Sequence, residues 1–369
     1  MCVAGARPNF MKVKPVMDEL EARGAECFLV HTGQHYDRAM NEIFFKELDL
    51  RSPDHFLGVG SGTHAQQTGL TMLAFEPLVT ELRPDLVVVF GDVNSTLACA
   101  LVAAKMGVAV AHVEAGPRSG DWSMPEEVNR VTVDRVSDYL LAPCEDAVAN
   151  LRVEGYRDER VHLVGNVMID TLLANVDSAR KRPVLENLGI SRGAFGLVTL
   201  HRPANVDDEH VLHGLLKALA EIGQELPLVF PMHPRTRDRL KQHLPPGVLT
   251  IEPQGYLDFV SLEDGAALVL TDSGGVQAET TALGTPCLTL RNNTEWPSTV
   301  AEGTNQLVGC DPGQILSSAR ELIKHPPPPL RPALWDGRAS KRVADVLISD
   351  QAAPQAGSRG STGCDATSR

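Results

Sequence analysis

Charged residues follow several short apolar runs of the sequence, at the points where buried strands would end. The run 86–90 leads to Asp92, 109–113 to Glu114, 197–200 to His201 and Arg202, 228–230 to His233, and 267–271 to Asp272 and Ser273. In open parallel α/β sheets, ligands bind outside the carboxyl ends of the strands. We therefore expect these residues to face one cleft, where they could carry acid–base chemistry on a phosphorylated small molecule.

Three carboxylates, Asp92, Glu114 and Glu126, follow two neighbouring predicted strands. Such groups can act as acid and base on opposite faces of a substrate. Simpler roles also fit: Asp92 could be a helix N-cap, and Glu126 with Glu127 could form the acidic first turn of a helix. Glu114 lacks such a role, because the small residues after it leave its carboxylate facing a cavity.

The segment Ser273-Gly274-Gly275 precedes a predicted helix that begins VQAET. Free N–H groups at a helix N-terminus attract anions such as phosphates, and Glu279, one turn later, could accept hydrogen bonds from sugar hydroxyls. The alternative is a capped helix in which Ser273 is the N-cap and the glycines serve only the turn.

A set of basic side chains could neutralise a departing diphosphate together with that helix N-terminus. The set comprises Arg7, Lys12, Arg118, Arg130, His201, Arg202 and His233. Each of them alone would be an ordinary surface charge. Neither a P-loop nor a dinucleotide-binding glycine motif occurs, and no spacing indicates a metal site. We therefore expect an enzyme without cofactor or metal.

The composition is that of an acidic globular chain of 369 residues, with 34 basic and 47 acidic side chains and a net charge of −13. This charge argues against nucleic acid or an anionic membrane as a partner. The seven cysteines are scattered, so neither a disulfide framework nor a thiolate zinc site is indicated. No apolar stretch is long enough for a membrane span, and we expect a cytoplasmic protein.

Apolar runs alternate with segments of helical period, which predicts an α/β protein with two doubly wound parallel sheets. Further strands are expected at 27–31, 161–164 and 287–290, and helices at 15–24, 95–106, 129–138, 211–226 and 276–283. A polar, turn-rich stretch at 170–195 divides domains 1–170 and 171–335, with Thr171 to Arg192 as the hinge. One more amphipathic helix is expected at about 336–350, and 351–369 is expected to be disordered.

Ten motifs occur in order between about residues 4 and 348, and with them the chain resembles the bacterial and archaeal UDP-N-acetylglucosamine 2-epimerase family. They are GARPNFMKVKP, HTGQHYD, GDVNSTLA, HVEAGPRSGD, MPEEVNR, VGNVMIDTL, LVTLHRP, MHPRT, TDSGGVQAE and WDGRASKRV. The resemblance implies two Rossmann-like domains in the arrangement of glycogen phosphorylase (GT-B), with the site between them and the last helix returning to the first domain. It also implies a homodimer and a role in surface polysaccharide synthesis.

The resemblance implies that UDP is eliminated across C1 and C2 of the sugar, giving 2-acetamidoglucal, and is then added back with the proton on the opposite face. UDP-N-acetylglucosamine and UDP-N-acetylmannosamine would thus be interconverted. By motif, Asp92, Glu114 and Glu126 resemble the acid–base set, and His201 the residue beside the diphosphate. The matching nucleotide-site residues are Arg7, Lys12, Gln254, Phe259, Ser273, Gly274, Gly275 and Glu279, with Gln254 and Phe259 flanking the uracil.

The sequence departs from the family pattern at several places. Asn9 and Ala204 stand where relatives often have glutamate, Trp296 stands where an arginine is frequent, and Pro117 replaces a leucine. Gln34, His35 and His233 match part of a second substrate site that activates many relatives, but an expected arginine is missing from GSGTHAQQTG. We therefore do not expect activation by substrate.

Other functions share these motifs or this architecture. A hydrolysing 2-epimerase would release N-acetylmannosamine and UDP, and a 2-epimerase of a modified UDP-sugar would use the same carboxylates. A two-domain glycosyltransferase would need an acceptor and has no evident use for three carboxylates near C1 and C2. A nucleotide-sugar sensor without turnover would not need Asp92, Glu114, Glu126 and His201.

Overall fold

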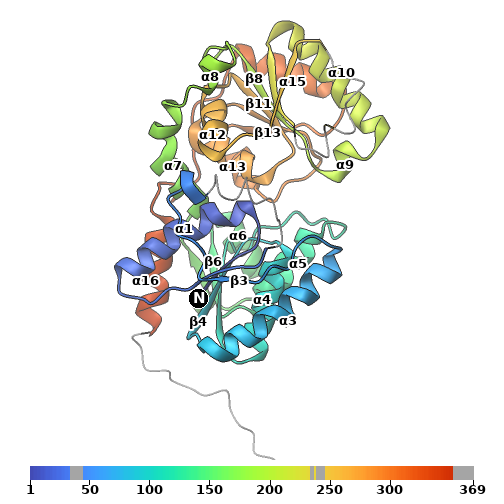
Figure 1. The fold of residues 1–369 in the computed structure, drawn as a ribbon. Coiled ribbons are helices and arrows are strands. Elements are labelled where there is room, and N and C mark those ends of the chain that lie inside the picture. The colour runs from blue at the N-terminus through green and yellow to red at the C-terminus, as the bar shows by residue number, and fades with distance from the viewer. Residues whose placement is uncertain (34–44, 233–236, 238–245, 352–369) are drawn as a thin grey trace, which may run out of the picture.

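Two lobes, each built on a parallel sheet covered by helices on both faces, make up the molecule (Figure 1). The computed structural model describes residues 1–33, 45–232, 237 and 246–351. The tail predicted to be disordered therefore lies outside the described residues, apart from Gln351, as do Gln34, His35 and His233. Within the described part of the chain, none of the helices is long and apolar enough to cross a membrane.

The first lobe contains a seven-stranded sheet of order β3-β2-β1-β4-β5-β6-β7. Its elements are β1 (Cys2–Ala4), α1 (Arg7–Ala22), β2 (Leu29–His31), β3 (His55–Phe56), α3 (His64–Leu82), β4 (Leu86–Phe90), α4 (Asn94–Lys105), β5 (Ala109–Val113), α5 (Pro125–Val136), β6 (Tyr139–Ala142), α6 (Glu145–Val153), a 3-10 turn (Asp158–Arg160) and β7 (Val161–Leu163). The central strands β4 and β5 pair over five residues each and are almost wholly buried, which explains their continuous apolar sequences.

The second lobe contains a six-stranded sheet of order β10-β9-β8-β11-β12-β13. Its elements are α7 (Val167–Arg180), α8 (Val184–Asn187), β8 (Gly196–Thr199), α9 (Pro203–Val206), α10 (Glu209–Glu225), β9 (Leu228–Pro231), β10 (Val248–Ile251), α12 (Tyr256–Gly265), β11 (Leu268–Thr271), α13 (Gly274–Leu283), β12 (Cys287–Thr289), α14 (Pro297–Ala301), β13 (Asn305–Leu307) and α15 (Pro312–Lys324). The predicted α/β class with two doubly wound sheets is confirmed.

The last helix, α16 (Ala339–Gln351), returns to the first lobe and lies beside α1 (Figure 1). Asp170 of α7 fixes its start, because the carboxylate accepts the backbone N–H groups of Ala339 at 3.0 Å and Ser340 at 2.6 Å. An acidic side chain at a helix N-terminus satisfies donors that the helix itself leaves free. The start of α16 is therefore tied to α7.

The stretch around 170–195 is helical over much of its length, which differs from the turn-rich linker that its polarity predicted. The first turns of α7 are buried because they pack among α1, α12, α13 and α16. Strands β1 to β7 all precede residue 170 and β8 to β13 all follow it. The hinge at Thr171 to Arg192 stays a prediction.

Helix α1 begins at Arg7, eight residues before the predicted start at Pro15, and Pro15 lies inside it. A proline inside a helix leaves the carbonyl four residues earlier without its donor. Here the Thr171 hydroxyl of α7 donates to that carbonyl, on Met11, at 2.6 Å. This long-range hydrogen bond replaces the missing helical one and ties α1 to α7.

Candidate active site

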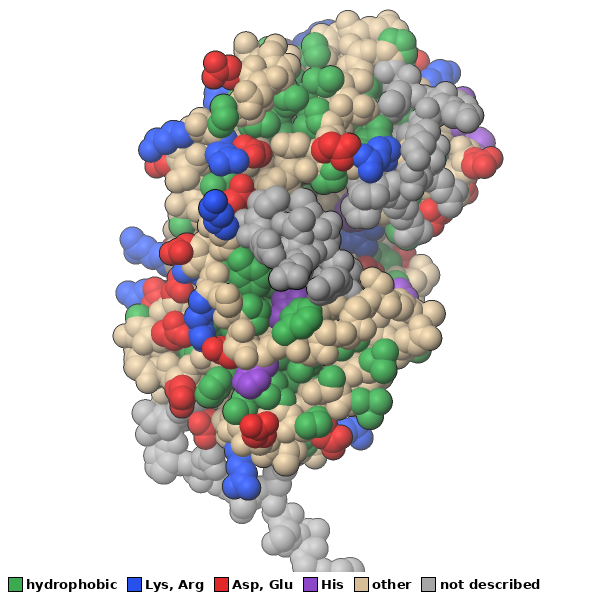
Figure 2. Space-filling model, viewed as in Figure 1, with side chains coloured by type: hydrophobic (Ala, Val, Ile, Leu, Met, Phe, Trp, Pro, Cys, Tyr) green, Lys and Arg blue, Asp and Glu red, His purple; other side chains and the backbone are tan. Residues whose placement is uncertain are grey.

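Each sheet has one point at which its strand order reverses, and candidate residues lie beside that point in both sheets. In the first sheet the reversal lies between β1 and β4, and in the second between β8 and β11. Asp92 follows β4, and His201 and Ser273 follow β8 and β11. Such reversal points are where open α/β sheets bind ligands. Figure 2 shows acidic, basic and histidine side chains together where the two lobes meet.

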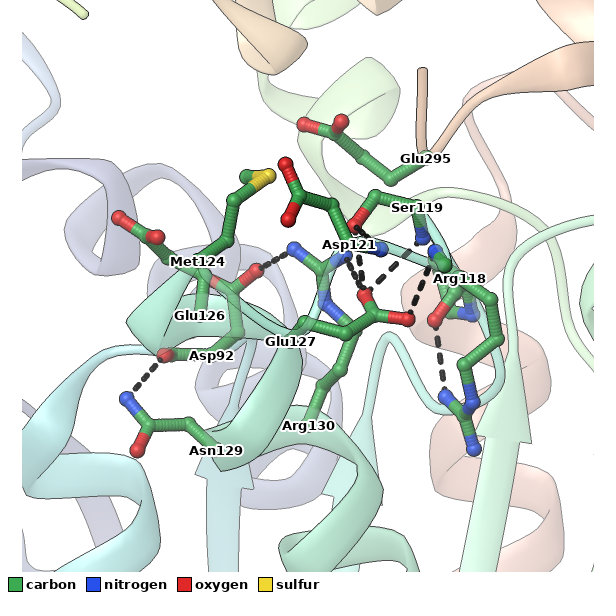
Figure 3. A network of polar contacts seen from close by, with 12 residues as sticks. Asp92, Arg118, Ser119, Asp121, Met124, Glu126, Glu127, Asn129, Arg130 and Glu295 are labelled. Atoms are coloured by element: carbon green, nitrogen blue, oxygen red, sulfur yellow. Dashed lines mark hydrogen bonds and ion pairs between the residues drawn. The ribbon is translucent and has the colours of Figure 1, made fainter. Parts of the chain in front are cut away.

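Asp92 lies against a buried arginine rather than at a helix cap. Its carboxylate pairs with the guanidinium of Arg130, which also reaches Glu127 at 2.8 Å (Figure 3). Burial opposes ionisation of Asp92, but the charges of Arg130 and Lys12 outweigh it and lower the pKa of the carboxyl. The N-cap alternative is wrong, because Val93 occupies the N-cap of α4. Asp92 is thus held as a carboxylate.

Glu114 follows β5 in a left-handed backbone conformation, with φ of 76°. This conformation is costly for a residue with a side chain, so the surrounding structure must hold it. Lys12 of α1 lies 2.7 Å from its carboxylate, and both side chains are nearly buried. A Cβ placed on Gly91 would lie 3.1 Å from the Lys12 ammonium and 3.6 Å from Glu114 Oε1, so the pair borders the turn that carries Asp92.

Glu126 and Glu127 lie in the first turn of α5, as the simpler interpretation predicts, but they differ in role. Glu127 is buried, and its carboxylate accepts the backbone N–H groups of Ser119 and Gly120 at 3.0 and 2.9 Å. Glu126 is partly exposed and lies 3.7 Å from Arg202 of the second lobe. Glu127 therefore holds the loop at Ser119 and Gly120 in place, while Glu126 borders the cleft.

His201 and Arg202 are positioned by Asp272, which the sequence placed at a strand end but to which no role was assigned. Asp272 is buried and accepts the backbone N–H groups of both residues, and it lies 2.9 Å from His201 Nδ1. Burial opposes its ionisation, but the His201 side chain and the backbone donors outweigh it and lower the pKa of Asp272. With Nδ1 directed to this carboxylate, His201 keeps Nε2 for a ligand. The position of Asp272 at a strand end was the available signal.

The N-terminus of α13 is where the sequence predicts an anion site. Ser273 is the N-cap, yet its side chain makes no capping hydrogen bond. Glu279, one turn along, is buried beside Tyr256 of α12, and burial raises the pKa of its carboxyl to about 7. The hydrogen bond from Tyr256 and the charge of Lys12 work against that rise.

Two further charged residues, Arg291 and Glu295, complete the cleft and were missing from the candidate set. Glu295 is 6% exposed, with its Oε2 at 2.8 Å from Arg291 and its Oε1 at 3.6 Å from Arg202. Arg291 also lies 4.0 Å from the Met124 sulfur of the first lobe, so it reaches across the cleft. The place of Arg291 just after the buried strand β12 could have marked it as a candidate site residue.

The guanidinium of Arg118 pairs with Asp134 and Glu154, each at 2.7 Å. Gln254 donates to the backbone carbonyl of Glu252 at 2.6 Å. Their substrate contacts stay predictions.

Three of the remaining predicted contacts also stay predictions. Phe259 of α12 is partly buried and packs against the apolar core of the second lobe. The side chain of Arg7 and all of His233 lie outside the described residues.

Among the described residues, no group of three or more His, Cys, Asp or Glu side chains could hold a metal.

Two departures from the family pattern have structural explanations. Asn9 accepts the N–H groups of Gly5 and Ala6, each at 3.0 Å, and donates its amide to Phe90 O at 2.9 Å, which a glutamate could not do. Trp296 is 3% exposed and packs edge-on against Trp335, with ring centroids 5.8 Å apart. It therefore joins α14 to the segment before α16.

The comparisons with known proteins agree with the fold. A family model described as UDP-N-acetylglucosamine 2-epimerase matches residues 18–348. The chain is 41% identical over 358 residues to a UDP-N-acetylglucosamine 2-epimerase of Methanocaldococcus jannaschii, covering 94% of this chain and 97% of that one. It is also 41% identical over 352 residues to a UDP-2,3-diacetamido-2,3-dideoxy-D-glucuronate 2-epimerase of Pseudomonas aeruginosa, covering 94% and 98%.

The solved structure of the Methanocaldococcus jannaschii UDP-GlcNAc 2-epimerase, in complex with UDP-GlcNAc and UDP, superimposes with a TM-score of 0.88. The two chains are 40% identical, and the match covers 94% of this chain and 99% of that one. Together with the two-domain architecture, these similarities define a nucleotide-sugar isomerase. The chain belongs to the UDP-N-acetylglucosamine 2-epimerase family.

Proposed function

We propose that this protein interconverts UDP-N-acetylglucosamine and UDP-N-acetylmannosamine. The observation that carries the proposal is the pair of carboxylates, Asp92 and Glu114, which follow the paired strands β4 and β5. The similarity to epimerases named for this substrate supports the choice of sugar. The helix α13 N-terminus and the surrounding cations suit a diphosphate.

In the proposed reaction, a base removes the proton from C2, the C1–O bond breaks, and its electron pair passes to the diphosphate oxygen of UDP. The neutral product is 2-acetamidoglucal. UDP then adds back to C1 while an acid delivers a proton to the other face of C2. Asp92, Glu114 and Glu126 supply the acid and base, and His201 with the nearby arginines stabilises the charge on the departing UDP.

The substrate-binding set extends this proposal to the nucleotide. Lys12, Arg130 and Arg202 contribute positive charge, Ser273 to Gly275 contact the phosphates, and Glu279 accepts the ribose hydroxyls. Arg7, Arg118, His233, Gln254 and Phe259 are the remaining predicted contacts, with the uracil between the last two.

A second candidate is a 2-epimerase of a modified UDP-sugar. The 41% identity to the enzyme named for a diacetamido glucuronate supports it, as do the departures at Ala204 and Trp296. A hydrolysing reaction, which would release N-acetylmannosamine and UDP, is the third.

Phosphorus NMR of the purified protein with each UDP-sugar separates these candidates. A UDP-N-acetylmannosamine signal that approaches equilibrium without free UDP supports the proposal. Steady accumulation of UDP would identify the hydrolysing reaction, and turnover of only the diacetamido uronate would identify the modified sugar.

We also propose a homodimer, with α3 in the interface. Leu70 and Leu73 are 51% and 70% exposed on this helix, and its sequence has no Asp, Glu, Lys or Arg before Glu76. An apolar-walled hollow of about 550 Å³ lies between α3 and the start of α5. Exposed apolar surface of this kind favours association.

A further inference from the structure

Glu295 occupies a place where a nucleotide diphosphate would meet repulsion. A Cβ placed on Gly274, the first residue of α13, would lie 2.1 Å from Glu295 Oε1, so the carboxylate lies directly against the start of that helix. Three arginines from both lobes, Arg291, Arg130 and Arg202, lower the pKa of Glu295 against the effect of burial. A buried negative charge therefore borders the expected phosphate site.

Glu295 does not satisfy all of the N–H donors of the arginines that face it. Arg291 is 7% exposed, and its Nη1 is buried without a hydrogen-bond partner among the residues that the structure describes. The same holds for Nε of Arg202. Buried donors of this kind are costly unless a ligand satisfies them, and guanidinium groups favour phosphate oxygens. The orphaned N–H groups thus point to an anionic ligand beside Glu295.

We propose that Glu295 is an internal counter-anion that competes with the substrate diphosphate for Arg202 and Arg291 and so limits how tightly UDP is held. This inference rests on the proposed function, in which UDP leaves C1 and must later add back. When the C1–O bond breaks, the electron pair stays on the diphosphate, so UDP carries more negative charge than the UDP-sugar. A fixed carboxylate therefore repels UDP more strongly than it repels the substrate.

The test is calorimetric binding of UDP, UDP-N-acetylglucosamine and uridine to the wild type and to Glu295→Gln. This substitution removes the charge and keeps the shape of the side chain. We expect UDP to bind at least about tenfold more tightly to the variant, UDP-N-acetylglucosamine to gain less, and uridine, which has no phosphate, to bind unchanged. Glu302→Gln, an exposed carboxylate seven residues later, is the matched control and should change none of the three affinities.

A Glu295→Gln affinity for UDP that is equal to or weaker than that of the wild type overturns the inference, and so does an equal gain for uridine. Glu295→Met is a second uncharged variant with the same expectations, in case the first folds poorly. Glu295→Asp keeps the charge and should stay within about threefold of the wild type. If the wild type itself binds no UDP, the proposed function fails rather than the role of Glu295.

Discussion

At the level of single residues, Asp92 and Glu114 are each held by one cation, Arg130 and Lys12 respectively. The lowered pKa of Asp92 keeps it ionised at neutral pH, so it is in the form that can accept a proton. We predict that Asp92→Asn or Glu114→Gln lowers turnover by at least about a hundredfold while UDP affinity changes little. Steady-state kinetics and calorimetry check this, with Glu302→Gln as control. Wild-type turnover in either variant would remove that residue from the mechanism.

Glu279 gives the ligand-free protein a stability that depends on pH. Burial raises its pKa to about 7, and the buried carboxyl of Glu263 and the Tyr256 hydroxyl lie around it. Such a group stabilises the fold while it is neutral, so its contribution is complete below the ordinary glutamate pKa and is lost as pH rises through about 7. Lys12 is the nearby charge that opposes this shift.

We therefore predict that the Tm of the ligand-free protein falls between about pH 5 and about pH 8, and that Glu279→Gln makes this fall smaller. Thermal unfolding monitored by circular dichroism at each pH provides the measurement. An identical slope in the wild type and the variant would mean that Glu279 does not titrate in this range.

At the level of elements, the segment before α16 anchors that helix to the rest of the molecule. Trp335 is 2% exposed, packs against Trp296 and donates its indole N–H to Pro143 O at 3.0 Å. We predict that Trp335→Ala lowers the free energy of unfolding by roughly 3–5 kcal/mol. Trp122, which is 65% exposed, provides the control, and its change to alanine should cost less than about 0.5 kcal/mol. Equal effects in urea unfolding would contradict this account.

Many elements could be predicted from the sequence because local patterns determine them. The strand at Leu86–Phe90 was predicted with its observed bounds, since a continuous apolar run between polar residues has few other interpretations. The early start of α1 could not be predicted, because the hydrogen bond that compensates for Pro15 comes from Thr171, far away in sequence. Short strands such as β3 and β13 likewise lack a clear apolar signal.

The candidate site likewise has residues that a local pattern reveals and residues that only the folded structure reveals. Asp92, Glu114 and His201 could be found because each follows an apolar run. Arg118 carries the same charge as Arg130, yet it pairs with Asp134, and no local pattern distinguishes the two. Arg291 could have been found by the same rule, because it follows the buried strand β12, whereas Glu295 lies in a loop and has no such signal.

At the level of the whole molecule, the exposed apolar face of α3 is the surface on which the proposed homodimer rests. We predict that Leu73→Glu shifts the protein from dimer to monomer, because a buried charge would be unpaired at such an interface. Light scattering after gel filtration measures the mass, and Val153→Glu, on the 89% exposed Val153 of α6, is the control. A wild-type monomer, or a Leu73→Glu dimer, would contradict the proposed interface.

The central claim is that chemistry occurs at C2 of a UDP-sugar between the two lobes. The most direct test is proton NMR of UDP-N-acetylglucosamine incubated with the wild-type protein in D₂O. The account predicts UDP-N-acetylmannosamine with deuterium at C2, because the proton is lost to one group and returned from solvent by another. An epimerised product that retains its original C2 proton, or a substrate that stays unchanged and undeuterated, would contradict it.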